Sequence, residues 1–148
     1  MSNVIIRPLR SSDEPEWRRL WDEYLKFYET SVTQDVYETY FARLLGDDPK
    51  DYSCLIAEIG AKPVGLTHFV FHRHGWKIEN VCYLQDLYTD PSHRGRGIGR
   101  ALTQAVYAAA DAAGAPGVYW MTNQGNLPAR RLYDSFATLT PFIKYARS

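Results

Sequence analysis

Apolar positions in the first third of the chain recur first at strand and then at helical spacing. The run Val4–Leu9 predicts a short strand at a sheet edge, because it contains Pro8. From Trp17 to Tyr28, apolar and aromatic residues return every three or four positions, which predicts a helix with one buried face. A second helix is expected from about Ser31 to Leu44, where its pattern ends.

The rest of the chain alternates strand-like runs with turns and one long helical stretch. Strand composition, rich in β-branched and aromatic residues, predicts further strands. A turn of glycine and proline joins the first two of these strands as a hairpin. The expected strands are Tyr52–Ile59, Val64–His72, Tyr83–Thr89, Val118–Thr122 and one or two within Phe136–Arg147.

The chain is organised around a strand, a glycine-rich turn and a helix that follow one another from Tyr83 to Gly114. A helix that begins at the glycines presents unpaired N–H groups and the positive end of its dipole, which together attract anions. Glycine lets a phosphate approach those N–H groups, and arginine adds charge with a geometry suited to phosphate oxygens. We therefore predict a phosphate or pyrophosphate site at Arg94, Gly95, Arg96, Gly97, Ile98, Gly99 and Arg100.

Two common phosphate-binding motifs do not fit this stretch. A Walker loop needs a lysine after its glycines, and none follows here. A dinucleotide fingerprint needs the spacing Gly-x-Gly-x-x-Gly and an acidic residue about 20 positions later, whereas the spacing here is Gly-x-Gly-x-Gly. Neither motif explains the glycines.

Two motifs resemble the GNAT superfamily of N-acetyltransferases. Arg94-x-x-Gly97-x-Gly99, directly after Leu87-Tyr88-Thr89-Asp90-Pro91, is similar to the acetyl-CoA signature of that family. Downstream, Asn126-x-x-Ala129-x-x-Leu132-Tyr133 is similar to its second motif. Within the superfamily, the chain most resembles the Hpa-type histone and polyamine acetyltransferases.

The resemblance implies an α/β fold: a mixed, mostly antiparallel sheet of about seven strands with helices on both faces. With 148 residues and no linker-like stretch, residues 1–148 are expected to form a single domain. Acetyl-CoA is the cosubstrate that the family implies. Its expected contacts are Leu87, Tyr88, Thr89, the stretch Arg94–Arg100, Asn126 and Tyr133.

The implied reaction is transfer of the acetyl group to a primary amine of a polyamine, an amino acid or a lysine side chain. The amine attacks the thioester directly through a tetrahedral intermediate, a backbone N–H beside Leu87 polarises the thioester, and Tyr133 is the expected catalytic acid. Tyr28, Glu29 and Gln85 are the expected acceptor-binding residues. Relatives usually have glutamate where this chain has Gln85, so the general base is unassigned and a noncatalytic acetyl-CoA-binding sensor is the alternative function.

Composition narrows the remaining possibilities. Seventeen basic and seventeen acidic residues balance, which favours neither nucleic acid nor a membrane surface as a partner. Two cysteines in apolar runs and the lack of a signal peptide suggest a cytoplasmic protein. The histidines at 68, 72 and 74 lack the spacing of a metal signature, so no metal is expected. A homodimer is expected by analogy with relatives.

Overall fold

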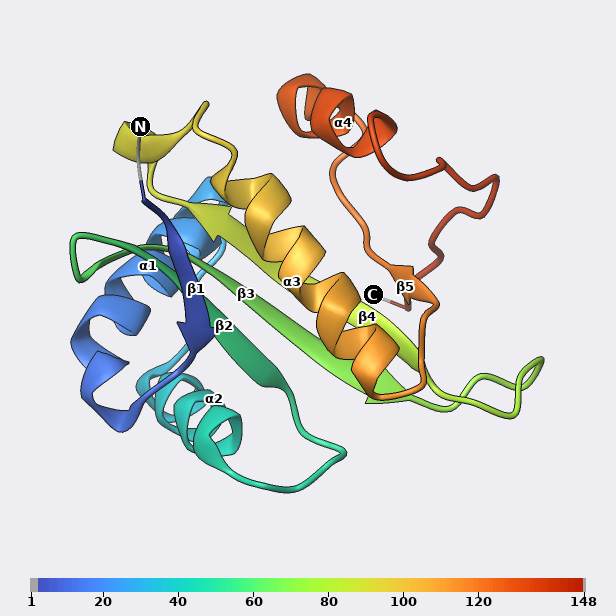
Figure 1. The fold of residues 1–148 in the computed structure, drawn as a ribbon, viewed down its shortest axis with the longest axis horizontal. Helices are drawn as coiled ribbons and strands as arrows, with labels where there is room; N and C mark the ends of the chain where they lie inside the picture. Colours follow the sequence, from blue (N-terminus) through green and yellow to red (C-terminus); the bar gives the residue numbers. More distant parts are fainter. Residues whose placement is uncertain (1–2, 148) are drawn as a thin grey trace.

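One mixed sheet runs through the computed structural model, which describes residues 3–147 (Figure 1). Its strands lie in the order β1-β2-β3-β4-β5, antiparallel throughout except that β5 runs parallel to β4. The strands are β1 (Ile5–Pro8), β2 (Ser53–Ile59), β3 (Lys62–His72), β4 (Val81–Thr89) and β5 (Val118–Tyr119). The helices are α1 (Glu14–Phe27), α2 (Gln34–Leu45), α3 (Ile98–Ala112) and α4 (Leu127–Asp134), with 3-10 turns η1 (Ser11–Asp13) and η2 (Pro91–His93).

Helices cover both faces of the sheet, as the sequence predicted (Figure 1). On one face, α1 and α2 bury an aromatic cluster that includes Trp17, Trp21 and Phe41. On the other face, α3 packs Leu102 and Val106 against the sheet. The three- and four-residue spacing of the α1 aromatics is what places them on a single buried face.

The hairpin between β2 and β3 turns at Gly60 and Ala61, which have φ angles of 55° and 65°. Ile59 pairs with Lys62, so the loop has two residues, and both occupy the left-handed region that such a turn requires. The predicted hairpin is therefore confirmed.

The predicted count of about seven strands is wrong for the part of the chain that the structure describes, where five form. The predicted strand Val118–Thr122 is reduced to two residues, because the backbone leaves the sheet after Tyr119. The Trp120 ring then packs near the rings of Tyr107 and Phe136. The predicted strands within Phe136–Arg147 do not form either. With so short a β5 beside it, this segment has little strand edge to pair with, and it leaves Phe142 and Tyr145 exposed.

Two further observations concern the cysteines and the polarity of the helices. Cys54 and Cys82 are buried and unbonded, as predicted for small apolar residues, and burial raises the pKa of both thiols. Within residues 3–147, none of the helices is long and apolar enough to span a membrane. Met1, Ser2 and Ser148 of the predicted 1–148 domain lie outside the described residues.

Candidate active site

The site begins where β4 and β5 separate. Only Cys82 and Tyr83 of β4 pair with β5, opposite Val118 and Tyr119. Beyond Tyr83, β4 continues to Thr89 with β3 on one edge and no strand of the described chain on the other. Backbone N–H and C=O groups on such an edge can pair with an extended ligand.

A β-bulge in β4 lies at this point of separation. His68 of β3 pairs with Asp86, and the next β3 residue, Phe69, pairs with Leu84, so Gln85 is the extra residue. Without the bulge, Leu84 and Asp86 would share one face of the strand. With it, Leu84 packs with the α3 cluster while the Asp86 carboxylate faces α1 and α2.

A small cavity, which we call the β4–β5 cavity, lies above the bulge. Its lining comes from β4, from Tyr24 of α1 and Tyr28 directly after α1, and from the segment after β5 together with α4. Its lining residues are Tyr24, Tyr28, Leu84, Gln85, Leu87, Trp120, Met121 and Tyr133. The structure therefore brings together Tyr28, Gln85, Leu87 and Tyr133, which the sequence assigned to the site.

Tyr133 reaches the cavity from α4 and is held by its neighbours. Its ring lies edge-on to Trp120, with centroids 5.4 Å apart, and near Phe136 at 6.5 Å. Burial, with a smaller contribution from Tyr28, raises the pKa of Tyr133 to about 12. The phenol is therefore protonated at neutral pH and has a proton to donate.

The glycine-rich turn has the open geometry that the sequence predicted. Gly95 and Gly97 both have φ of 78°, a conformation that favours glycine, and no atom lies within 4 Å of a Cβ placed on either one. Gly97 precedes α3, so Gly99 and Arg100 lie in the first turn of this helix, where N–H groups lack intrahelical partners. The loop and helix start together offer a concave set of backbone donors.

The arginines flank this turn on two sides. The Arg94 guanidinium lies over the rings of Phe27 and Tyr88, at 5.9 and 5.5 Å, and its Nε donates to the Thr89 carbonyl. Arg100 lies 5.0 Å from the Phe136 ring centroid, and its Nη2 donates to Ser135 Oγ. Arg96 is exposed in the turn itself. These side chains place positive charge around the glycines.

Several predicted ligand contacts use their side chains elsewhere. The Tyr88 hydroxyl donates to Glu23 Oε1 at 3.0 Å, and Ile98 is buried in the core. Asn126 Oδ1 accepts from Ala129 N, which makes Asn126 the N-cap of α4, as the sequence also predicted. Tyr88 and Ile98 can therefore meet a ligand only through their backbone.

Glu29 does not line the β4–β5 cavity. It follows the end of α1 with φ of 55° and is exposed to solvent. The sequence could not show this, because the turn after α1 depends on the left-handed conformation of Glu29, which side-chain periodicity does not reveal.

Sequence reasoning missed four lining or supporting residues: Tyr24, Trp120, Met121 and the buried His68. Tyr24 belongs to the same helical stripe as Tyr28, and the four-residue spacing between them was the available signal. His68, for which the sequence predicted only that it does not bind a metal, is fully buried. His72, at the end of the same strand, lies with its Nε2 2.7 Å from the Tyr119 hydroxyl.

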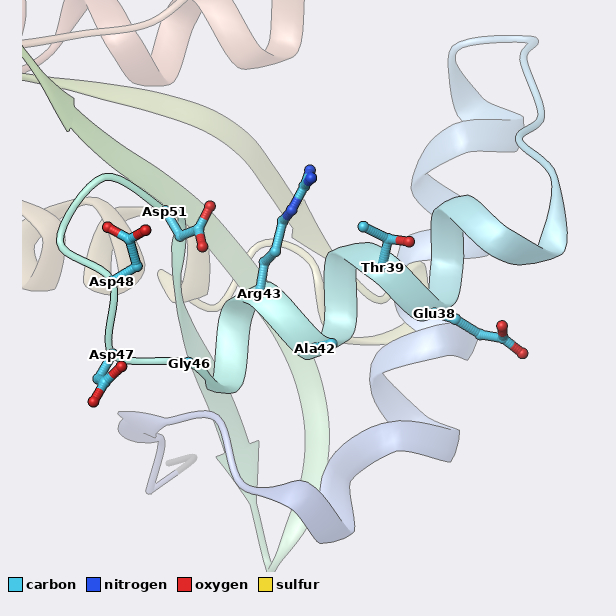
Figure 2. A pocket seen from close by; sticks show the side chains of 8 residues that line it. All are labelled: Glu38, Thr39, Ala42, Arg43, Gly46, Asp47, Asp48 and Asp51. Atoms are coloured by element: carbon cyan, nitrogen blue, oxygen red, sulfur yellow. The ribbon is translucent and has the colours of Figure 1, made fainter.

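A larger hollow, of about 480 Å³, lies on the other side of the molecule along α2 and the loop after it. Figure 2 shows that its acidic side chains, Glu38, Asp47, Asp48 and Asp51, point in different directions and do not converge on one point. Arg43 lies among them. The hollow shares no residue with the β4–β5 cavity, and α2, which supplies half of its lining residues, packs with α1 on the face of the sheet opposite α3.

The open edge of β4, the glycine turn and the flanking arginines fit an extended ligand that carries a pyrophosphate. Acetyl-CoA has this shape, because an extended pantetheine arm joins its thioester to its pyrophosphate. When bound, acetyl-CoA supplies an activated acetyl group as a thioester.

Comparisons with known proteins agree with this geometry. Residues 17–137 match the family model described as the acetyltransferase (GNAT) family. The D-amino-acid N-acetyltransferase HPA3 of Saccharomyces cerevisiae is 35% identical, over 98% of this chain and 91% of that protein. The thialysine N-epsilon-acetyltransferase of Bos taurus is 32% identical over 72% of this chain, and the match spans 66% of the bovine protein.

Solved structures share the fold at low identity. The ribosomal-protein-alanine N-acetyltransferase from Brucella melitensis biovar Abortus 2308 has a TM-score of 0.77 at 21% identity, covering 98% of both chains. The aminoglycoside N-acetyltransferase AAC(6')-Iy, in complex with CoA, has a TM-score of 0.83 at 18% identity, covering 100% of this chain and 96% of that chain. Together with the family match over most of its length, these findings show that the chain belongs to the GNAT acetyltransferase family and is an acetyl-CoA-dependent N-acetyltransferase.

Proposed function

We propose that this protein acetylates the primary amine of a free amino acid. The observation that carries the proposal is the lining of the β4–β5 cavity, which among the described residues includes no carboxylate. A polyamine or a lysine-rich peptide carries several ammonium groups, and desolvating them requires opposing charges. An amino acid brings one amine together with its own carboxylate. The names of the yeast and bovine relatives, which refer to D-amino acids and thialysine, support the same class of acceptor.

The proposed reaction is direct attack of the neutral amine on the thioester carbonyl. An unpaired β4 N–H beside Leu87 stabilises the oxygen of the tetrahedral intermediate, because the edge of β4 is open there. Tyr133 then protonates the departing sulfur. Its pKa of about 12 keeps the phenol protonated until a thiolate forms beside it.

Tyr28 and Gln85 are the proposed contacts of the acceptor. Both line the cavity, Tyr28 from the residue directly after α1 and Gln85 from the bulge of β4. The Gln85 Oε1 accepts from the Tyr52 hydroxyl at 3.2 Å, which orients the amide. Glu29 lies outside the cavity lining, so we propose no direct contact for it.

Release of CoA thiol from acetyl-CoA tests the proposal. The acceptor panel contains D- and L-amino acids, thialysine, spermidine and a lysine-rich peptide. We expect turnover with D- or L-amino acids or with thialysine. The contrast between simple amino acids and thialysine shows whether the α-amine or a side-chain amine reacts. Turnover confined to spermidine or to the peptide would reject the amino acid as acceptor. Stabilisation by acetyl-CoA without turnover on any amine would favour the noncatalytic sensor.

We also propose that the protein forms a homodimer through its C-terminal segment. Large apolar side chains of this segment, Leu139, Phe142, Ile143 and Tyr145, are all more than two thirds exposed in the single chain, with relative exposures of 72, 76, 76 and 89%. A second copy of the chain would cover them. Sedimentation equilibrium tests this, and a monomer at micromolar concentration would reject it.

A further inference from the structure

A buried hydrogen-bonded chain connects Trp17, His68 and Asp86 next to the bulge of β4. Trp17 Nε1 donates to His68 Nε2 at 2.9 Å, and His68 Nδ1 lies 2.7 Å from Asp86 Oδ2. An indole nitrogen only donates, so Nε2 of His68 accepts and Nδ1 carries the ring proton, which it donates to the carboxylate. The Tyr40 hydroxyl donates to the same Oδ2 atom at 3.1 Å. The Asp86 side chain is therefore bonded to α2 and β3, and through His68 to α1.

The main chain of Asp86 is held as well. The Thr67 hydroxyl, on β3, donates to the Asp86 carbonyl oxygen at 2.9 Å. Thr67 and His68 are fully buried and Asp86 is 4% exposed, so these bonds form away from water. Two consecutive residues of β3 thus hold one residue of β4, by its carbonyl and by its carboxylate.

Asp86 directly follows Gln85, the extra residue of the bulge. A bulge leaves its extra residue unpaired and disrupts the ladder, so strand pairing alone does not fix the backbone there. On the N-terminal side of the bulge, Leu84 is anchored in the buried α3 cluster. On the C-terminal side, the buried bonds of Asp86 provide the anchor. Gln85 therefore lies between two residues that are held on opposite faces of the sheet.

A buried carboxylate is a costly way to hold a strand. Apolar residues of similar size in place of buried ionic groups often leave stability unchanged or raise it, whereas buried polar groups can specify one arrangement of the chain. The hydrogen-bond partners of Asp86 are two hydroxyls and a neutral imidazole. This favours a role of Asp86 in fixing the position of the bulge over a role in stability alone.

We propose that Asp86 is a positioning residue for acetyl transfer, and that its buried bonds keep the Gln85 amide in the cavity lining and the β4 N–H beside Leu87 within reach of the thioester oxygen. This inference rests on the proposed function, which assigns those two groups to the acceptor and the thioester. Gln85 and Leu87 adjoin Asp86 on either side and line the β4–β5 cavity, whereas Asp86 is not one of the lining residues. Asp86 therefore acts through its two neighbours.

A small displacement of the bulge is enough to affect the reaction. Groups that polarise a reacting carbonyl must be placed accurately, and a shift of about 1 Å can cost about 100-fold in rate. The glycine turn, where we propose that the pyrophosphate binds, is built from residues that follow β4. We therefore expect kcat to depend on Asp86 much more than the affinity for acetyl-CoA does.

The experiment compares Asp86→Asn with Asp86→Ala, using the best amine found in the acceptor panel. Asparagine keeps an oxygen that can accept from His68 and Tyr40 but cannot take up a proton, whereas alanine removes the anchor. We expect Asp86→Asn to keep kcat within about fivefold of wild type with an unchanged pH profile, and Asp86→Ala to lose about 100-fold. Acetyl-CoA affinity, measured by calorimetry, should change by less than about threefold in both. Equal losses of kcat in the two variants, or no loss in either, would overturn the positioning role.

Thr67→Val tests the same anchor if Asp86→Ala does not fold, because it removes only the hydroxyl that holds the Asp86 carbonyl. Thr103→Val is the matched control: this threonine is also buried, and its hydroxyl donates to the Gly99 carbonyl at 2.8 Å within α3. Both should lower the thermal midpoint by about 2–4 °C, but only Thr67→Val should lower kcat, by about tenfold at saturating acetyl-CoA. Equal kcat values in the two variants would overturn the positioning role and leave the proposed function intact. Absence of wild-type turnover with every amine would overturn both.

Discussion

The Tyr133 ring lies edge-to-face against Trp120, with centroids 5.4 Å apart and ring planes inclined at 66°. Trp120 in turn packs near Tyr107 of α3, at 6.3 Å, so α4 is tied to the main body of the protein through an aromatic chain. This packing holds the Tyr133 side chain in the lining of the β4–β5 cavity. The orientation of the proposed catalytic acid therefore depends on side-chain packing.

Tyr133→Phe should lower kcat by about 100-fold while the affinity for acetyl-CoA changes by less than about threefold. The phenol acts on the leaving thiolate, which exists only as the reaction proceeds, so its loss affects turnover more than binding. Tyr107→Phe is the control, because it removes a hydroxyl from the same aromatic chain outside the cavity lining. Steady-state kinetics and calorimetric binding of acetyl-CoA measure the two quantities. Equal loss of both, or no loss, would rule out the acid role.

Gly97→Ala should weaken acetyl-CoA binding by about tenfold or more, because a methyl group at φ of 78° strains the turn and projects toward the pyrophosphate site. Gly114→Ala provides a matched control: its φ is 69°, and it lies at the opposite end of α3. Both variants should lose about 1 kcal/mol of unfolding free energy. Only Gly97→Ala should lose affinity in a calorimetric titration. Unchanged binding by Gly97→Ala would contradict the anion role of the turn.

Asp13→Asn should lower the unfolding free energy by about 2 kcal/mol at neutral pH, since it breaks a buried bidentate pair. Both carboxylate oxygens of Asp13 lie 2.8 Å from guanidinium nitrogens of Arg7. The hydrogen bonds from Arg7 hold the pKa of Asp13 below its usual 3.8, which burial alone would raise. Urea denaturation measures the effect, and Asp47→Asn, an exposed change, should stay within about 0.5 kcal/mol.

The pH dependence of that pair has a definite sign. Because the pKa of Asp13 is lower in the folded protein than in the unfolded chain, its stabilisation is complete above the unfolded value, near 3.8. It is lost as the pH falls through the lower, folded value. The stability difference between wild type and Asp13→Asn should therefore narrow in acid below about pH 4. A difference that persists unchanged to pH 2 would contradict the ion pair as its cause.

Local chemistry made much of the fold predictable. The φ angles at Gly60 and Gly97 and the capping bond of Asn126 are local properties, so they followed from residue type and spacing. The aromatic stripe of α1 and its burial followed from helical periodicity.

What could not be predicted depends on contacts between distant parts of the chain. The bulge at Gln85 is a mismatch in register between β3 and β4, and no residue type announces it. His68 meets Trp17 and Asp86 only after three elements pack together, so a lone histidine in a strand gave no sign of the buried chain. The missing final strands reflect the two-residue length of β5, which the apolar pattern of residues 136–147 does not contain.

Gln85→Glu should raise activity near neutral pH, because it places a carboxylate directly in the lining of the β4–β5 cavity, where it can accept the proton of the acceptor amine. The new oxygen can still accept from the Tyr52 hydroxyl, which now bonds Gln85 at 3.2 Å, so the side chain keeps its place. The variant should gain about tenfold in kcat/KM near pH 7 over wild type, and its dependence on pH should flatten. Gln104→Glu adds an equal charge on the exposed side of α3 and should leave kcat/KM unchanged. A gain from both glutamates, or from neither, would show that a carboxylate at position 85 does not act as the proton acceptor.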